Sequence, residues 1–200
     1  MTPPRPLPVA ASPYLSAENL RELSSARAAS RKVRRAIAIA SFDGWTIGVF
    51  GGLTLLFGLT DFSSIALGLG MGAVAFVELR GAGRLRRLEA GAARTLGFNQ
   101  VALGTMLMLY AIWHIVAQLT GPSPYQAIKS SDAQLAHMLQ PIEDLSRMVM
   151  IGIYSALIAI AFFAQGGLAL FYFSRERHVQ RYVTQTPAWI VTMQRTGIAL

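Results

Sequence analysis

Five polar side chains stand in otherwise apolar parts of the sequence, and they are the groups most able to do chemistry there. They are Asp43, Asn99, Gln100, His114 and Gln165. A carboxylate deep in lipid marks an ion or proton site by default, and an imidazole can bind a metal or a heme iron. Amide side chains can line a weakly polar pore or make polar contacts between helices.

Asp43 is expected at the membrane surface rather than at the membrane centre. If the chain folds back at Asp61, Asp43 stands eighteen residues before the turn and Leu79 eighteen residues after it. Glu78 and Arg80 then share the depth of Asp43. The sequence therefore predicts an interfacial ion pair between Asp43 and Arg80, and no pair of acidic side chains inside the membrane.

His114 is expected to touch water near the other end of its helix. It follows Tyr110 and Trp113, and aromatic side chains of this kind gather in belts at the membrane interface. A role as a metal or heme ligand would need a second histidine at matching depth. Neither His137 nor His178 has a spacing that predicts one, so we expect no metal and no cofactor.

The sequence contains no motif for catalysis. It has no P-loop, no HExxH and no GxSxG, the patterns that bind phosphate, hold catalytic zinc or present a nucleophilic serine. It also has no cysteine, which excludes disulfides, thiol nucleophiles and thiolate metal sites. We therefore expect a protein that is not an enzyme.

The composition identifies the elements that must position these side chains. Of the 200 residues, 53% are hydrophobic and 14% are charged, whereas soluble domains have about 25% charged residues. Segments of about 20 apolar residues can cross the bilayer as helices. The predicted fold is an all-α polytopic membrane protein with four transmembrane helices in two hairpins, at residues 36–59, 62–79, 98–119 and 145–173.

Four further segments flank these predicted helices. Residues 1–15 form a proline-rich arm, and residues 16–35 predict a basic juxtamembrane helix. Residues 80–97 are arginine- and glycine-rich and predict a basic surface loop with one or two short helical turns. The tail, 175–200, carries an apolar patch at 189–193 that is expected to lie on the bilayer or to dock on a partner.

The basic residues predict the orientation of the chain. Sixteen of them lie in the N-terminal segment, the loop between the second and third spans, and the tail, whereas the opposite side has only Lys129 and Arg147. By the positive-inside rule both termini are cytoplasmic, which favours a bacterial inner membrane. The basic face is expected to meet anionic lipid headgroups. Positive charge divided among alternate loops does not indicate a nucleic-acid surface.

Glycines recur every four residues on the first two predicted spans. Gly44, Gly48 and Gly52 form one stripe, and Gly68 and Gly72 form the other. Small residues let helix backbones approach closely in lipid, where van der Waals packing replaces the hydrophobic effect. These stripes predict helix packing within the hairpin and association with a second copy or with another membrane protein.

Three functions remain open from the sequence. The first is an oligomeric or accessory subunit of a membrane complex, indicated by the glycine stripes, the arm and the apolar tail. The second is a homo-oligomeric ion channel whose pore is lined by weakly polar residues such as Thr46, Thr54, Ser155 and Gln165. The third is a membrane enzyme or heme carrier that uses His114.

Overall fold

The structure, a computed structural model, describes residues 16–122 and 133–197. The predicted arm at 1–15 lies outside the described residues, which form helices and no strand. The helices are α1 (Ala17–Ala29), α2 (Arg31–Phe57), α3 (Phe62–Arg86), α4 (Ala90–Thr120), α6 (Ala133–Ile160), a π-helical segment η1 (Ala161–Gln165), α7 (Gly166–Gln185) and α8 (Ala188–Arg195).

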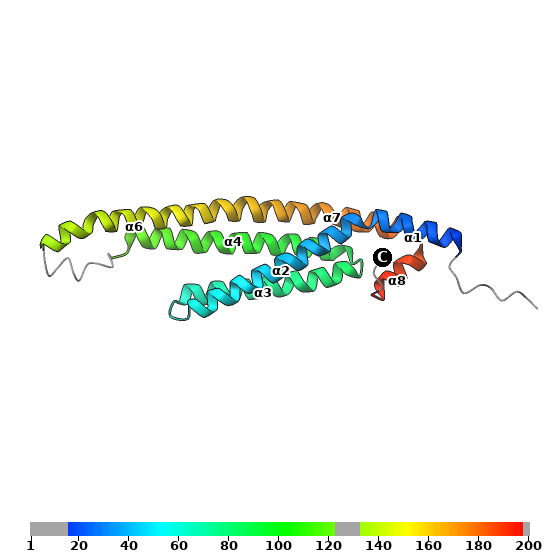
Figure 1. Cartoon of the computed structure of the whole chain (residues 1–200), viewed down its shortest axis with the longest axis horizontal. Coiled ribbons are helices and arrows are strands. Elements are labelled where there is room, and N and C mark those ends of the chain that lie inside the picture. Colours follow the sequence, from blue (N-terminus) through cyan, green and yellow to red (C-terminus); the bar gives the residue numbers. More distant parts are fainter. Residues whose placement is uncertain (1–15, 123–132, 198–200) are drawn as a thin grey trace, which may run out of the picture.

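The all-α prediction is confirmed for the residues that the structure describes, and among them four helical stretches are long and apolar enough to cross a membrane. They are Arg31–Phe57, Phe62–Arg86, Ala90–Thr120 and His137–Gln185. The last of these joins α6, η1 and α7 into one rod that runs the length of the molecule (Figure 1). The chain is therefore a multi-pass membrane protein.

The α2–α3 hairpin is packed through glycines, although not through all of those predicted. An added Cβ would lie 2.9 Å from Leu79 at Gly44, 3.5 Å from Ala75 at Gly48 and 2.6 Å from Leu55 at Gly68. The same Cβ at Gly52 or Gly72 would meet nothing within 4 Å. These two positions therefore face away from the hairpin contact.

Gly51 takes the place that the four-residue spacing assigned to Gly52. Its added Cβ would lie 3.0 Å from Met71 Cβ and 3.3 Å from the backbone nitrogen of Gly72. At about 100° per residue, Gly51 lies about 20° around the helix from Gly44, whereas Gly52 lies about 80° away. A strict four-residue repeat drifts off the contact face because the helix has 3.6 residues per turn.

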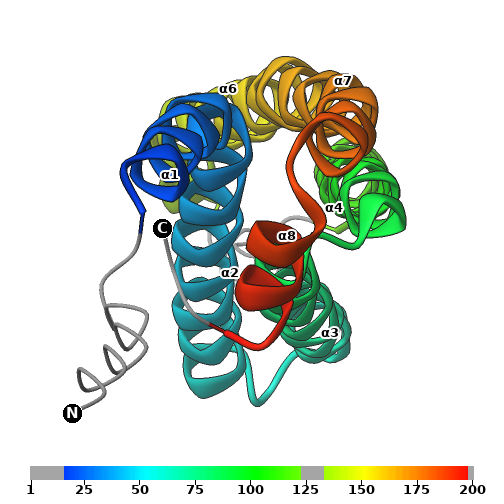
Figure 2. The ribbon, with the colours of Figure 1, turned by 90° about the vertical axis from the view of Figure 1, so that its right-hand side faces the viewer.

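Helix α4 lies between α3 and α7, as an end view shows (Figure 2), and it also packs against α6 and η1. Two of its glycines, Gly97 and Gly104, leave room for large neighbouring side chains. An added Cβ at Gly97 would lie 2.5 Å from the Phe173 ring, and one at Gly104 would lie 3.0 Å from Gln165 Cβ. These close contacts hold α4 against the fourth span.

The predicted basic loop at 80–97 is helical instead. Helix α3 continues to Arg86 and α4 begins at Ala90, which leaves a turn of only three residues. Two of the glycines that suggested a loop are packing positions: an added Cβ at Gly81 would lie 2.5 Å from Leu96, and one at Gly97 would lie 2.5 Å from Phe173, whereas Gly83 and Gly91 have nothing within 4 Å. Helical glycine is tolerated where such close packing compensates for its low helix propensity.

The fourth span also differs in detail from the prediction. Helix α6 begins at Ala133, ahead of the predicted start at residue 145, and Pro141 lies inside it. A π-helical segment, η1, lies immediately before Gly166 and Gly167. Such segments insert one extra residue per turn and are frequent at functional sites.

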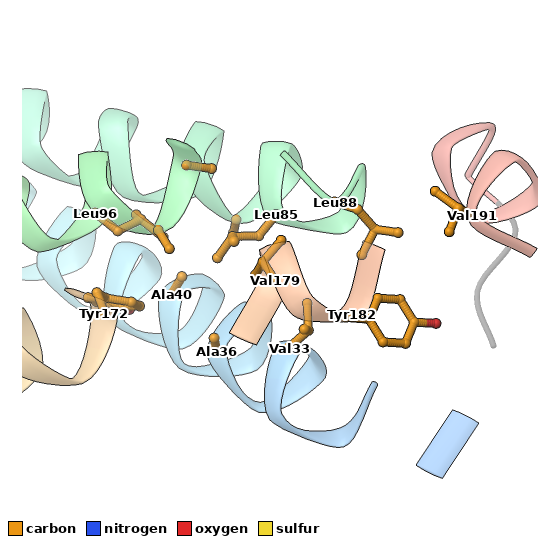
Figure 3. Close-up of a cluster of buried hydrophobic side chains, with 13 residues drawn as sticks. Val33, Ala36, Ala40, Leu85, Leu88, Leu96, Tyr172, Val179, Tyr182 and Val191 are labelled. Carbon is orange, nitrogen blue, oxygen red and sulfur yellow. The ribbon is translucent and has the colours of Figure 1, made fainter. Parts of the chain in front are cut away.

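The described N-terminal and C-terminal helices lie at the same end of the bundle, together with the α3–α4 turn (Figure 1). A buried cluster of apolar side chains joins α2, α3, α4, α7 and α8 at this end (Figure 3). Its labelled members are Val33, Ala36, Ala40, Leu85, Leu88, Leu96, Tyr172, Val179, Tyr182 and Val191. This core fixes the ends of all four spans on that side.

The apolar patch of the tail packs within this core rather than on a surface. Ile190 is 0% exposed and Val191 is 6% exposed. The indole nitrogen of Trp189 donates to Glu22 Oε2 over 2.9 Å, and the Tyr182 hydroxyl donates to Gln194 Oε1 over 2.9 Å. The chain thus covers much of the patch that was expected to need a bilayer or a partner.

Candidate functional site: a buried cluster of carboxylates and amides

Five polar side chains from four helices meet inside the bundle. They are Asp43 from α2, Glu78 from α3, Asn99 and Gln100 from α4, and Tyr172 from α7. Glu78, Gln100 and Tyr172 are fully buried, and Asn99 is nearly so. We call this set the polar cluster.

The register of the α2–α3 hairpin brings the two carboxylates together. Gly44 follows Asp43, and an added Cβ at Gly44 would lie 3.2 Å from Glu78 Cβ. The absence of a side chain at Gly44 therefore lets α3 approach α2 at this level. This agrees with the equal depth that the sequence predicts for Asp43 and Glu78.

Helix α4 supplies the hydrogen-bond donors. Asn99 Nδ2 donates to Glu78 Oε2 over 2.7 Å and to the Val74 carbonyl oxygen over 3.0 Å. Gln100 Nε2 donates to Glu78 Oε1 over 3.0 Å and also to Asp43 Oδ2. One amide nitrogen of Gln100 thus bridges the two carboxylates.

Two polar atoms of the cluster remain without a hydrogen bond. They are Gln100 Oε1 and the hydroxyl of Tyr172, and both are buried. Tyr172 lies close enough to Glu78 to interact with its carboxylate electrostatically, although the hydrogen-bond geometry is not met. Unsatisfied buried polar atoms are costly, and folded proteins contain only a few of them.

The predicted Asp43–Arg80 ion pair is not formed. Between described residues, the ion pairs are Arg84–Glu89 and Glu143–Arg147, and Asp43 is bonded to Gln100 instead. Asp43 and Glu78 instead lie close together within the bundle, where one nitrogen of Gln100 bonds both. The equal depth of Asp43 and Glu78 was the signal for that pair, but the flanking arginine suggested a surface position.

A second polar group lies where α3, α4 and α6 meet, and it contains His114. Its Nε2 lies 3.3 Å from Ser63 Oγ, and its ring stacks on Tyr154 at a centroid distance of 4.9 Å. The Tyr110 ring lies 4.4 Å away. This agrees with the predicted aromatic surroundings, and no three metal-binding side chains gather anywhere in residues 16–122 and 133–197.

Gln165 belongs to neither group. Its side chain packs against Gly104, about one helical turn along α4 from Gln100. Its Oε1 is buried and has no hydrogen-bond partner. Of the residues selected from the sequence, Asp43, Asn99 and Gln100 come together, while Gln165 and His114 stay apart. Glu78 and Tyr172 were not selected as site residues.

The polar cluster holds two acidic groups and only uncharged hydrogen-bond donors. A bound proton or small cation would supply the positive charge that buried carboxylates require. No protein-family model, no curated protein and no solved structure matches this chain.

Proposed function

We propose that this chain is a non-enzymatic membrane protein whose polar cluster binds one proton or one monovalent cation. The observation that carries this proposal is the bridge from Gln100 Nε2 to both Asp43 and Glu78. Two carboxylate oxygens that accept from one nitrogen lie within about 6 Å of each other. If both were charged, they would repel by about 3 kcal/mol at an effective dielectric constant of about 20.

A single positive charge between the carboxylates removes this repulsion. Gln100 Oε1 and the Tyr172 hydroxyl are available as neutral oxygen ligands, since neither has another hydrogen bond. Hard monovalent cations prefer oxygen ligands, and a proton needs only the two carboxylates. The chemistry of the donors therefore favours H⁺, Na⁺ or K⁺ over a transition metal.

The proposal also includes the orientation of the chain in the membrane. Helix α1, the α3–α4 turn and α8 lie at one end of the bundle (Figure 1), and the segments at that end carry most of the basic residues. This supports cytoplasmic placement of both termini, contact with anionic headgroups, and a location in the inner membrane of a bacterium.

The chain acts as a subunit of an assembly in this proposal. The outward-facing positions Gly52 and Gly72, where an added Cβ would meet nothing within 4 Å, are available for close contact with a helix of a second copy or of another membrane protein. The tail patch no longer supports assembly, because Ile190 and Val191 are buried within the chain. Native mass spectrometry in mild detergent tests this part, and a purely monomeric chain with no bound protein contradicts it.

Cation-dependent stability tests the binding site. The unfolding of the wild-type protein is compared in sodium, potassium and choline salts of equal ionic strength, and at decreasing pH. A ligand whose free concentration is about 100 times its dissociation constant raises the free energy of unfolding by about 2.7 kcal/mol. We expect Na⁺, K⁺ or H⁺ to stabilise the wild type, and to stabilise Glu78→Gln or Asp43→Asn much less.

Glu18→Gln is the matched control, because Glu18 is exposed on α1 and outside the polar cluster. It should respond to ions as the wild type does. Circular dichroism establishes whether each variant is folded. If Glu78→Gln does not fold, the comparison is made with Asp43→Asn. Equal responses in the wild type and in a folded cluster variant would exclude the site.

A homo-oligomeric ion channel is the second candidate, and Gln165 favours it. Its partnerless amide oxygen lies beside the π-helical segment, and this gives a polar position deeper in the bundle than the polar cluster. In planar bilayers we expect unitary currents that Gln165→Leu reduces. Reproducible absence of current across voltages and lipids would remove this candidate and leave the binding proposal standing.

A further inference from the structure

A pocket of about 950 Å³ opens between α2, the α3–α4 turn and the end of α8. We call it the arginine pocket, because six arginines line it: Arg34, Arg80, Arg84, Arg86, Arg87 and Arg195. Glu89 is the acidic residue among its lining residues. Segments far apart in the sequence thus bring positive charge to one hollow at the end of the bundle.

Most of this positive charge has no acidic partner in the described part of the chain. Glu89 accepts from Arg84 Nε over 2.7 Å, and Arg86 donates to the neutral hydroxyl of Ser41. Arg80, Arg87 and Arg195 form no ion pair with any described residue. Guanidinium groups gathered in this way repel one another, and an anion in the pocket would relieve that repulsion.

The backbone around the pocket is held in an unusual conformation. Leu88 has a φ of 59° and Gly197 has a φ of 99°, and both line the pocket. Left-handed leucine is rare, and here burial of its side chain in the core holds the turn in place (Figure 3). The buried Leu88 side chain thus anchors the turn beside Arg86 and Arg87.

We infer that the arginine pocket is a binding site for a phosphate group, carried by an anionic lipid headgroup or by a soluble phosphate compound. Arginine binds phosphate through two parallel hydrogen bonds, which lysine-rich surfaces cannot match in geometry. The volume falls within the range of ligand pockets. Basic pockets at the ends of membrane helices recognise anionic headgroups by this chemistry.

A defined pocket predicts saturable binding, which distinguishes it from diffuse attraction of the basic helices to a charged bilayer. Native mass spectrometry of the purified chain in detergent measures binding of phosphatidylglycerol and of phosphatidylcholine with the same acyl chains. The pocket variant is Arg87→Gln with Arg195→Gln. The matched control is Arg31→Gln with Arg35→Gln, which removes equal charge from exposed positions on α2 outside the pocket lining.

We expect one tightly held phosphatidylglycerol per chain, little retention of phosphatidylcholine, and binding weakened about tenfold or more in the pocket variant. The control should change by less than about twofold. A second arm adds inorganic phosphate: displacement of the lipid, or phosphate binding alone, assigns the site to the phosphate group itself. Equal losses in both variants, or equal retention of both lipids, would show diffuse attraction only and overturn the inference.

Discussion

Gln100 on α4 donates a hydrogen bond to Glu78 on α3 over 3.0 Å, and both side chains are completely buried. The same nitrogen also bonds Asp43 on α2. Three of the four spans are thereby joined at one point by a neutral group that faces two acidic ones. Side chains of this kind inside a membrane bundle are expensive to bury, and they are retained where they carry a function.

Replacing Gln100 should therefore destabilise the bundle. Gln100→Leu removes the donor that bridges Asp43 and Glu78, and buried acceptors lose their partner. We expect a loss of about 2–4 kcal/mol in the free energy of unfolding, measured by unfolding in mixed micelles of sodium dodecyl sulfate. Gln118→Leu, on the same helix at a partly exposed position, should change it by about 0.5 kcal/mol or less. A loss of equal size in both variants would contradict the bridge.

The packing of α2 on α3 gives a second prediction with a control one residue away. Gly51→Leu places a side chain against Met71 and the backbone of Gly68 and Gly72, and we expect this overpacking to cost about 1–3 kcal/mol of unfolding free energy. Gly52→Leu points into open space and should leave the unfolding of the monomer unchanged. If Gly52→Leu is the more damaging of the two in a monomeric preparation, the hairpin register is wrong.

These positions also show how far the sequence could predict the fold. The lengths of the apolar stretches were sufficient to predict the four spans, because a chain that crosses lipid must form long continuous helices. The contact glycines were only partly predicted, because a four-residue repeat looks regular in sequence but rotates around the helix. Gly51 was missed for this reason, although its seven-residue separation from Gly44 places it on the same face.

The candidate site was harder to predict than the fold. The depth of Asp43 and Glu78 followed from counting residues on either side of the turn. The hydrogen-bond partners of these two carboxylates could not be predicted, because nothing in the sequence shows that α4 turns Asn99 and Gln100 toward the hairpin. Arg80 is close in sequence to Glu78 and suggested a surface ion pair, whereas a buried amide is the partner of Asp43.

Asp61 should give a pH dependence at the start of α3. Its carboxylate accepts from the backbone nitrogen of Ser64 over 2.9 Å and from the hydroxyls of Ser63 and Ser64. The Ser63 and Ser64 hydroxyls, with the backbone nitrogens, hold the pKa of Asp61 well below its ordinary value of 3.8. The stabilisation is thus complete above that ordinary value and is lost as pH falls toward the lower pKa of the folded state.

Asp61→Ala tests this dependence. The variant should unfold at lower temperature than the wild type at neutral pH, and the difference should shrink only when the pH falls below about 4. Melting curves followed by circular dichroism across this range give the comparison. A difference that stays constant into strong acid would show that the charge of Asp61 does not stabilise the cap.

The docking of α8 can be tested by protease sensitivity. Ile190 is 0% exposed, so Ile190→Asp buries a charge with no partner and should release the tail. We expect trypsin to cleave after Arg195, the last residue of α8, at least about tenfold faster than in the wild type, since local opening controls such cleavage. Thr192→Asp, at an exposed position of the same helix, is the control. Equal cleavage of both variants and the wild type would mean that the tail is not held by this contact.

Infrared difference spectroscopy of the protein in lipid tests the proposed charge site most directly, because carboxylic acids and carboxylates absorb at different frequencies. Spectra are recorded while pH and the concentrations of Na⁺ and K⁺ are changed. We predict a protonated carboxyl band, or a carboxylate band that shifts with the cation, that is present in the wild type and in Glu18→Gln and lost in Glu78→Gln. Difference spectra that are the same with and without the Glu78 carboxyl would show that the polar cluster binds neither a proton nor a cation.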